Sequence, residues 1–446
     1  MGSFFRTIFL SFSGPVFLFI GLLVIFYTFQ TVNVDLLPVL SLLLLFAPIW
    51  IPVSLFYILF PRWMESIQLK HQDKMGRVTL EITLPQDVFK SPQAMEEVLS
   101  QTWNKNKPYN IFQTFWDGKH ALTYSFEIVS IGGNVKLFAN LPIKKAKDVF
   151  EAQMYAQYPG IEIKEVPVDY TAEIKNNQDE WQWMSFHFGK VEDDVFPIKT
   201  YIDWGLDKNP KEEEKIEPMA PVLEQMANIR SHERFWLQIL AVPHGKKDFS
   251  TGSLGKTPDW TSRARAKINE IMGRESSKTD LGEPDAQPRL TMGERDLVTH
   301  IERNTSKIAY ETVIRMIYAA PKGKFRAETM TSLLSTLKAT YTVVGRNDLA
   351  VRWRTDFDYN IFSDPSGKRA AKYKTKELDF YKLRTYVPFD VRNGSDAPKV
   401  MSVEEIATLW HIPGKAIVTP GVGRVEALRR DAPANLPVGD PNNPWT

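Results

Sequence analysis

Apolar residues dominate the start of the chain in two uninterrupted runs. Residues 7–29 and 36–60 contain no charged side chain, and as helices rising 1.5 Å per residue each could cross a hydrocarbon core of about 30 Å. Residues 30–35 leave room only for a tight connection, so the pattern predicts an antiparallel transmembrane hairpin. Because the positive charges lie outside the connection, the positive-inside rule places both chain ends in the cytoplasm. These flanking charges are Arg6, Arg62, Lys70, Lys74 and Arg77.

Two other interpretations of the apolar runs fit less well. A cleaved signal peptide would have an apolar core of about 7–15 residues and a small-residue cleavage site, and neither occurs. A transport path through broken helices would explain the interruptions, but such paths usually hold ionisable groups, and none lies in either run. We therefore expect a membrane anchor. The interruptions are Gly14, Pro15, Pro38, Pro48 and Pro52.

From Arg77 the pattern changes to that of a mixed α and β domain. Strand-like alternation and helix-like periodicity follow one another in the order βαββαβ, which is the ferredoxin-like arrangement. A Gly132-Gly133-Asn134 turn joins the central hairpin. The predicted elements are strands at 77–85, 122–131, 135–141 and 161–166 and helices at 91–103 and 144–158.

The same order recurs with weaker spacing in the second half. It is interrupted at 245–307, where we expect helices at 260–272 and 293–304 and a mobile middle, 274–289. Internal duplication and two independently built sheets both explain the repeat. Lys208–Glu217 is a charge run typical of a solvated loop. The predicted elements are strands at 196–204, 234–242, 309–319 and 348–353 and helices at 219–229 and 326–341.

These patterns predict an α+β, membrane-anchored fold. A transmembrane helical hairpin precedes two ferredoxin-like (βαββαβ) units, and a short helix and a Pro-rich tail follow them. The predicted divisions are 1–76 for the hairpin and juxtamembrane segment, 77–175 for the first unit, 176–365 for the second unit, and 366–446 for the C-terminal extension.

Composition excludes several kinds of functional site. The absence of cysteine excludes disulfides, thiolate nucleophiles, iron–sulfur clusters and cysteine-ligated zinc. The seven histidines never show the H-x-x-x-H spacing of a metal site. With 55 basic and 53 acidic residues the net charge is +2, which is too small to indicate nucleic-acid binding by the whole molecule.

No enzyme motif is complete. Gly255-Lys256-Thr257 lacks the first glycine of a phosphate-binding loop, which would fall at Ser250, and Pro258 follows where a helix should begin. There is no G-x-S-x-G elbow, and the acid pairs Asp193-Asp194 and Glu404-Glu405 are typical of a surface. We therefore predict a non-enzymatic protein without a cofactor. An enzyme with a cleft between the two units is the alternative.

A basic strip and a terminal helix are the candidate binding sites. The strip could neutralise phosphates of DNA or of anionic lipid, and a solvated basic loop is the alternative. Residues 402–410 have the pattern of a capped amphipathic helix, which either docks a partner or closes its own domain. The candidate phosphate contacts are Lys368, Arg369, Lys372, Lys374 and Lys376, and the candidate docking residues are Ile406, Leu409, Trp410 and Ile412. The alternating aromatics Trp181, Trp183, Phe186 and Phe188 predict a packed strand.

Several segments in a fixed order resemble the membrane-proximal part of bacterial type IV secretion and conjugation ATPases, especially those of small-genome candidate-phylum bacteria. The likeness covers most of residues 80–437. The segments are LEITLPQDVFKSPQAMEEVLSQTW (80–103), FEIVSIGGNVKLFANLP (126–142), VFEAQMYAQYPGIEI (149–163), EPMAPVLEQM with FWLQILAVP (217–243), EEIATLWHIPG (404–414) and APANLP (432–437).

In that family the last of these segments is followed by a motor domain with a Walker A motif, whereas this chain ends at Thr446. The resemblance implies an anchor and adaptor subunit at the bacterial inner membrane that docks a separate motor ATPase, or else a split or shortened gene. The expected partners are the lipid bilayer, the ATPase or another transfer-apparatus protein, and a further copy of the chain, with DNA contact less well supported.

Overall fold

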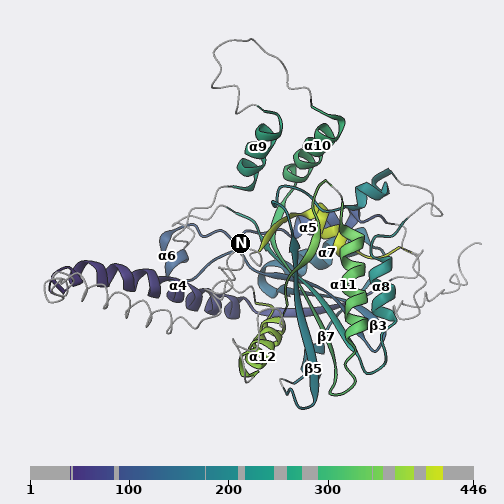
Figure 1. Ribbon diagram of the computed structural model, residues 1–446, viewed down its shortest axis with the longest axis horizontal. Helices are drawn as coiled ribbons and strands as arrows, with labels where there is room; N and C mark the ends of the chain where they lie inside the picture. The colour runs from purple at the N-terminus through teal and green to yellow at the C-terminus, as the bar shows by residue number, and fades with distance from the viewer. Residues whose placement is uncertain are drawn as a thin grey trace, which may run out of the picture.

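A computed structural model shows one antiparallel sheet with helices on both faces (Figure 1). The structure describes residues 41, 44–84, 90–175, 177–208, 216–245, 259–273, 290–343, 345–354, 367–385 and 398–414. The predicted first apolar run, the GKT tripeptide, the middle of the insertion at 274–289 and the Pro-rich tail lie outside these residues, as does most of the charge run 208–217.

The sheet has nine strands, and its main path runs β4-β1-β3-β2-β6-β7-β5-β8. Each half has the same order when read from its own edge, β4-β1-β3-β2 and β8-β5-β7-β6. The halves join where β2 pairs with β6, for example Ile128 opposite Leu237, and β9 pairs with the start of β7. The strands are β1 (Arg77–Thr83), β2 (Tyr124–Ile131), β3 (Asn134–Pro142), β4 (Glu162–Glu165), β5 (Trp181–Lys190), β6 (Arg234–Pro243), β7 (Ala309–Pro321), β8 (Leu349–Arg354) and β9 (Lys399–Ser402).

The predicted fold class is therefore wrong. Instead of two ferredoxin-like units behind a membrane hairpin, a single sheet continues across both halves, because β2 and β6 each present a full-length edge to the other. Periodicity within a strand shows which of its faces is buried but not which strand lies beside it. The pairing of β2 with β6 could therefore not be predicted from the sequence.

The turn between β2 and β3 requires its glycines. Gly132 and Gly133 have φ values of 61° and 92°, a region that L-residues rarely adopt. A Cβ on Gly132 would also lie 2.6 Å from the carbonyl oxygen of Ser231. The hairpin can therefore close against the neighbouring loop only with glycine at this position.

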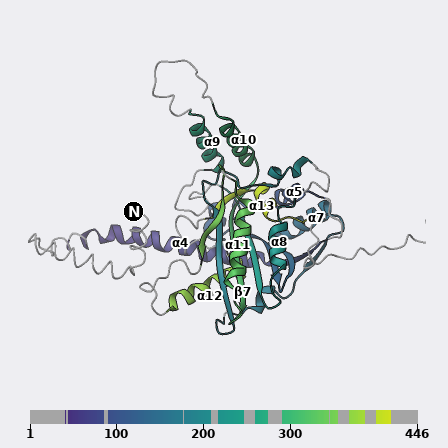
Figure 2. The same ribbon diagram turned by 45° about the vertical axis from the view of Figure 1, so that its right-hand side comes forward.

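Helices cover the two faces of the sheet unequally. α5, α7, α8, α11 and α13 pack on the face that carries Phe126 and Ile128 of β2, whereas α12 packs on the opposite face, against Trp183 and Trp236. α9 and α10 project from the body beside a third apolar cluster (Figures 1 and 2). The helices are α4 (Ala47–Met75), α5 (Gln93–Thr102), α6 (Ile111–Phe115), α7 (Asp148–Gln157), α8 (Ala220–Ala227), α9 (Trp260–Ile271), α10 (Met292–Ser306), α11 (Ala327–Tyr341), α12 (Lys368–Leu383) and α13 (Val403–Leu409).

The predicted transmembrane hairpin and its two-span placement in an inner membrane are also wrong. Among the described residues, no helix combines the length and the apolar character that a membrane crossing needs. α4 overlaps the second apolar run, but only its first fifteen residues, 47–61, are uncharged. At 1.5 Å per residue they span about 22 Å, which is less than a core of about 30 Å.

The second half departs from its predicted elements at one strand. Residues 196–204 form a loop that ends in a 3-10 helix, Tyr201–Trp204, capped by Thr200 and Asp203. The strand is β5 instead, and the prediction that its alternating aromatics pack is confirmed, since Trp183, Phe186 and Phe188 are buried. The two helices expected in the insertion are confirmed as α9 and α10.

Candidate functional site

The predicted basic strip is part of a helix rather than a loop. It forms the first half of α12, in which Lys368 and Lys372 are exposed and Lys374 and Lys376 are half-buried. The side chain of Arg369 lies outside the described residues. The indole nitrogen of Trp183 donates to the carbonyl oxygen of Lys374 at 3.1 Å, so the strip is fastened to the sheet. Its contact with phosphates stays a prediction.

The predicted docking residues lie inside the core. Ile406, Leu409, Trp410 and Ile412 are each at most 4% exposed. The Trp410 ring lies 4.9 Å from the ring of Phe126, and its indole nitrogen donates to the carbonyl oxygen of Glu127 at 3.3 Å. The predicted capped helix is confirmed as α13, but its apolar side chains leave no surface for a partner. They close the protein's own core, which is the alternative role given above.

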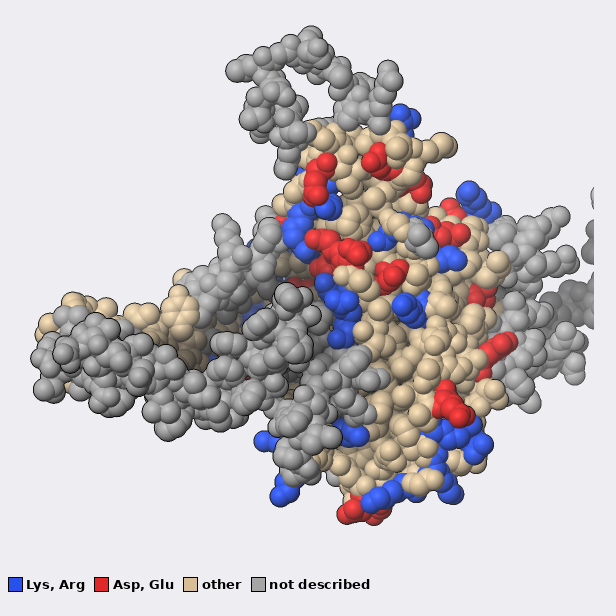
Figure 3. All heavy atoms as spheres, viewed as in Figure 1, with Lys and Arg blue, Asp and Glu red and all other residues tan. Residues whose placement is uncertain are grey.

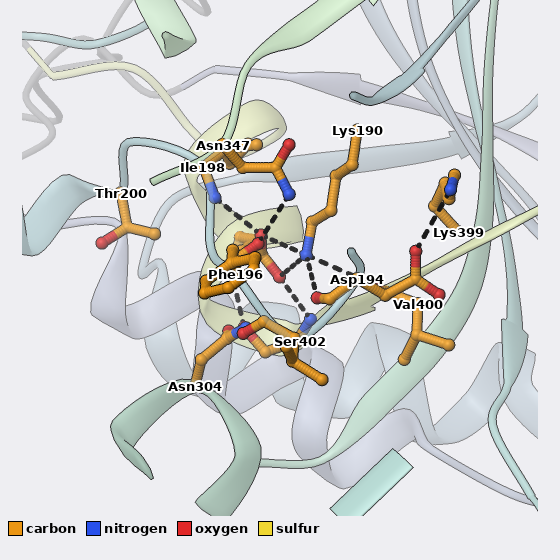
Figure 4. A network of polar contacts seen from close by, with 12 residues as sticks. Lys190, Asp194, Phe196, Ile198, Thr200, Asn304, Asn347, Lys399, Val400 and Ser402 are labelled. Atoms are coloured by element: carbon orange, nitrogen blue, oxygen red, sulfur yellow. Dashed lines mark hydrogen bonds and ion pairs between the residues drawn. The ribbon is translucent and has the colours of Figure 1, made fainter. Parts of the chain in front are cut away.

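The acid pair Glu404-Glu405 is buried, contrary to its predicted place at the surface. The Lys190 ammonium lies 2.8 Å from the Glu405 carboxylate, and both side chains are 0% exposed. Lys190 also donates to the carbonyl oxygens of Asp194 and Val400 (Figure 4). Burial raises the pKa of Glu405, although Lys190 opposes this shift. All three ammonium donors are therefore engaged, and the pair locks β5 to α13.

Glu404 makes a second set of ties toward α10. Its carboxylate lies 3.0 Å from Arg303 and 2.8 Å from Lys307, and the Thr200 hydroxyl donates to it at 2.5 Å. Lys307 also pairs with Glu96 of α5 at 2.7 Å. These contacts join three helices, so we assign Glu404 a structural role.

A third buried network holds the end of α12 on the opposite face of the sheet. Arg384 contacts the Glu127 carboxylate at 2.8 Å and Asp169 at 2.5 Å, and the Tyr170 hydroxyl donates to Glu127 at 2.8 Å. Burial alone would raise the pKa of Glu127, but the charge and hydrogen bonds of Arg384, together with the hydroxyl hydrogen bonds of Ser125 and Tyr170, outweigh burial and hold the pKa below its usual value. This arrangement anchors α12.

In the described part of the chain, neither the hollows nor the metal-binding groups provide a candidate functional site. One hollow, of about 220 Å³, lies where β1 ends and β3 begins, between apolar side chains such as Leu84 and Val135 and the ion pair of Glu81 with Lys136. In the same residues, no three His, Asp or Glu side chains are grouped so that they could hold a metal ion.

The most unusual feature of the molecule is an exposed apolar surface. Both views show α4 extending outward from the sheet body (Figures 1 and 2), and the described atoms of its outer end are uncharged on the face shown in Figure 3. We call this feature the α4–α6 surface. Its exposed members are Ile49, Ile51, Val53, Leu55, Phe56, Tyr57, Ile58, Leu59, Trp63, Tyr109, Ile111, Phe112 and Trp116.

Aromatic contacts fix α6 against the middle of α4. The Phe60 and Phe115 rings lie 5.8 Å apart, and those of Trp63 and Trp116 lie 6.4 Å apart. The Trp63 indole nitrogen donates to the carbonyl oxygen of Phe115 at 3.2 Å. The Asn110 side chain caps α6 by accepting from the backbone nitrogen of Gln113 at 2.9 Å. The short helix is therefore held with its apolar residues beside those of α4.

Two neutral histidines fasten the other end of α4 to the body. Nδ1 of His120 donates to the carbonyl oxygen of Gly118 at 2.8 Å, so its Nε2 accepts from the amide of Gln72 at 3.0 Å. The Asn106 amide donates to Nε2 of His71 at 3.2 Å and to the carbonyl oxygen of His120 at 2.8 Å. Both acceptor roles require an unprotonated Nε2.

The surroundings of this clamp keep both rings neutral. Burial lowers the pKa of His120 to about 4. Burial also lowers the pKa of His71, and the nearby charges of Lys119 and Lys74 add to the effect. The helix approaches closely here, since a Cβ on Gly118, whose φ is +65°, would lie 2.3 Å from the carbonyl oxygen of Ile67.

Cations line the base of the α4–α6 surface. The Arg62 side chain is 70% exposed beside Glu65, and the Lys119 ammonium lies 4.5 Å from the centre of the Tyr109 ring. Lys105 and Lys107 are exposed in the segment that leads to α6.

Reasoning from sequence missed the α6 part of this surface. An asparagine followed by Ile111, Phe112, Phe115 and Trp116 is the usable signal, because such large residues are rare in a solvated loop. The exposure of these side chains depends on how far α4 covers them, and the sequence alone does not predict that.

Comparisons with known proteins assign the family but no activity. No curated protein matches the chain. They give no support to the predicted assignment to secretion or conjugation, because the matching family carries only the description of a domain of unknown function. The family model begins inside α4, so the apolar first half of this helix precedes the matched region, whereas α6 lies within it. Since the model for the domain of unknown function DUF8128 matches residues 68–424, the chain belongs to that family.

Proposed function

We propose that the protein is an adaptor, a binding module that attaches through the α4–α6 surface and holds its sheet body at the place of attachment. The observation that carries this proposal is the exposure of thirteen large apolar side chains on α4 and on the adjoining residues 109–116 in and around α6. Contiguous apolar patches larger than a few hundred Å² are rare on monomeric proteins and mark interaction sites.

The size of the surface supports an obligatory partner. If each of these side chains exposes roughly 80 Å², the surface measures on the order of 1,000 Å². At about 25 cal/mol per Å², covering it would release on the order of 25 kcal/mol before the costs of association. Scattered single apolar residues would not require such an explanation, but a continuous surface of this size does.

The sheet body is suited to holding a bound protein in place rather than to catalysing a reaction. Lys190, Glu405 and Glu127 are engaged in contacts that fasten helices to the sheet. The rigid sheet body could therefore position a bound protein at high local concentration. The resemblance described above makes a separate motor ATPase our candidate for that protein.

Photo-crosslinking in the native cells tests the proposal. A photoreactive residue replaces Phe112, which is 72% exposed on the α4–α6 surface, and in a matched control it replaces Met292, which is 90% exposed on α10. We expect adducts, with protein or with lipid, at position 112 and none at position 292. An absence of adducts at position 112 overturns the adaptor proposal. Failure to recover any ATPase with the crosslinked protein rejects only that candidate partner.

A further inference from the structure

We infer that the α4–α6 surface docks on an anionic lipid surface, with the apolar half of α4 immersed among the acyl chains and α6 at the level of the headgroups. The inference rests on the proposed function and names the partner of the same surface. It concerns insertion from one side, since the uncharged part of α4 is too short to cross.

The first argument is the distribution of exposure around α4. Residues 51–59 are exposed at every position, and successive positions on a helix point about 100° apart, so all sides of this segment are open. A protein partner covers one stripe of a helix, whereas a helix that is apolar all round needs an apolar environment on every side. Acyl chains provide such an environment.

The second argument is the position of the aromatic side chains. Trp63, Tyr109 and Trp116 are at least half exposed and lie close to where the uncharged part of α4 ends at Arg62. Tryptophan and tyrosine favour the boundary between headgroups and acyl chains, because one end of the side chain is apolar and the other is polar. These residues therefore mark the depth at which α4 would enter.

The third argument is the charge at that level. In residues 62–65 and 104–119, which carry the base of the surface, four cations, Arg62, Lys105, Lys107 and Lys119, outnumber two acids, Glu65 and Asp117. The resulting two positive charges would strengthen binding to an anionic lipid surface by roughly 30-fold over a neutral one.

Because the chain has no cysteine, the test can use single labelled sites in the full-length protein. Phe112→Cys and the matched control Met292→Cys are each labelled with an environment-sensitive fluorophore. They are mixed with vesicles of phosphatidylcholine alone or with phosphatidylglycerol added, and bound protein is separated by flotation. A second pair without a label, Phe112→Ser and Met292→Ser, measures affinity.

We expect emission at position 112 to shift to the blue on vesicles while emission at position 292 stays unchanged. Binding should be roughly 30-fold tighter on the anionic vesicles, an advantage that falls as salt is raised, and Phe112→Ser should weaken binding several-fold. Since both positions are exposed, neither substitution should affect folding.

Three other results would overturn the inference in distinguishable ways. If flotation and the shift at position 112 are both absent while crosslinking there still captures a protein, the lipid inference fails and the adaptor proposal stands. If crosslinking also yields nothing, both fail. Equal affinity for neutral and anionic vesicles rejects the preference for anionic lipid.

Discussion

The buried pair of Lys190 and Glu405 allows a sharp test of what holds the C-terminal segment in place. Lys190→Met removes the cation that pairs with the fully buried carboxylate of Glu405. Glu405 keeps the backbone donors of Ile198 and Ser402, at 3.0 and 2.9 Å, while the carbonyl oxygens that Lys190 served lose their donor. A buried charge left without its partner typically costs about 3–5 kcal/mol, so we expect the free energy of unfolding to fall by this amount.

Urea unfolding at pH 7 measures this loss, with Lys267→Met as the matched control. Lys267 also pairs with a glutamate, Glu270 at 2.8 Å, but on an exposed helix face, and removing it should cost at most about 1 kcal/mol. The double variant Lys190→Met with Glu405→Gln should be more stable than Lys190→Met alone, because a neutral amide needs no cation. Equal stability of Lys190→Met and Lys267→Met would refute the reasoning.

The effect should also depend on pH. Burial already raises the pKa of Glu405, and loss of Lys190 should raise it further. A carboxyl whose folded pKa lies above its unfolded value contributes stability below the unfolded pKa, near 4.5, and loses it as pH rises through the folded pKa. The deficit of Lys190→Met should therefore be smallest at acidic pH, as a urea titration at pH 4.5 and 7 would show.

Three further changes test the core and the attachment of α4. Trp410→Ala should cost about 3–5 kcal/mol in urea unfolding, because it empties a fully buried site, and a cost below about 1 kcal/mol would contradict this. The pKa of His120 is lowered to about 4 in the folded protein. The contribution of His120 to the free energy of unfolding is therefore complete above the unfolded pKa of about 6.5 and falls by at most about 3 kcal/mol as the pH drops toward 4. Thermal unfolding of the wild type should show this loss, and His120→Gln should not show it. Gly118→Ala should cost about 1–3 kcal/mol, because its Cβ would strike Ile67, and hydrogen exchange should rise in residues 104–120 but not in α11.

Local pattern predicted several elements of the fold but not their neighbours. β1, β2 and β6 begin and end within about two residues of their predicted limits, because alternation reports a strand with one face in the core. Local pattern predicts no helix for the basic run at the start of α12, which is instead helical. Its helix is fixed by Leu378 and Tyr381, which pack in one cluster with Trp183 of β5 and Trp236 of β6, more than 140 residues earlier in the chain. Such distant contacts leave no trace in local periodicity.

The candidate site was only half visible from sequence for a similar reason. The apolar run in α4 was evident, but the histidine clamp brings together His71 and His120, 49 positions apart, in a contact between rings 5.9 Å apart. Conversely, the sequence predicts a surface position for Glu404 and Glu405, because charged residues are usually exposed. Their burial depends on Lys190 and Lys307, whose positions beside them only the folded chain determines.

The place of Trp410 beneath the first half of the sheet has a consequence for biosynthesis. Its partner Glu127 is made 283 residues earlier, so at about 5–20 residues per second the ribosome needs on the order of 15–60 s to supply the residue that completes the core. Until then Phe126 and Phe150 lack the ring that covers them. A nascent chain of this protein must therefore spend most of its synthesis with apolar core residues exposed to other molecules. This makes it a natural client for chaperones that bind unfinished chains.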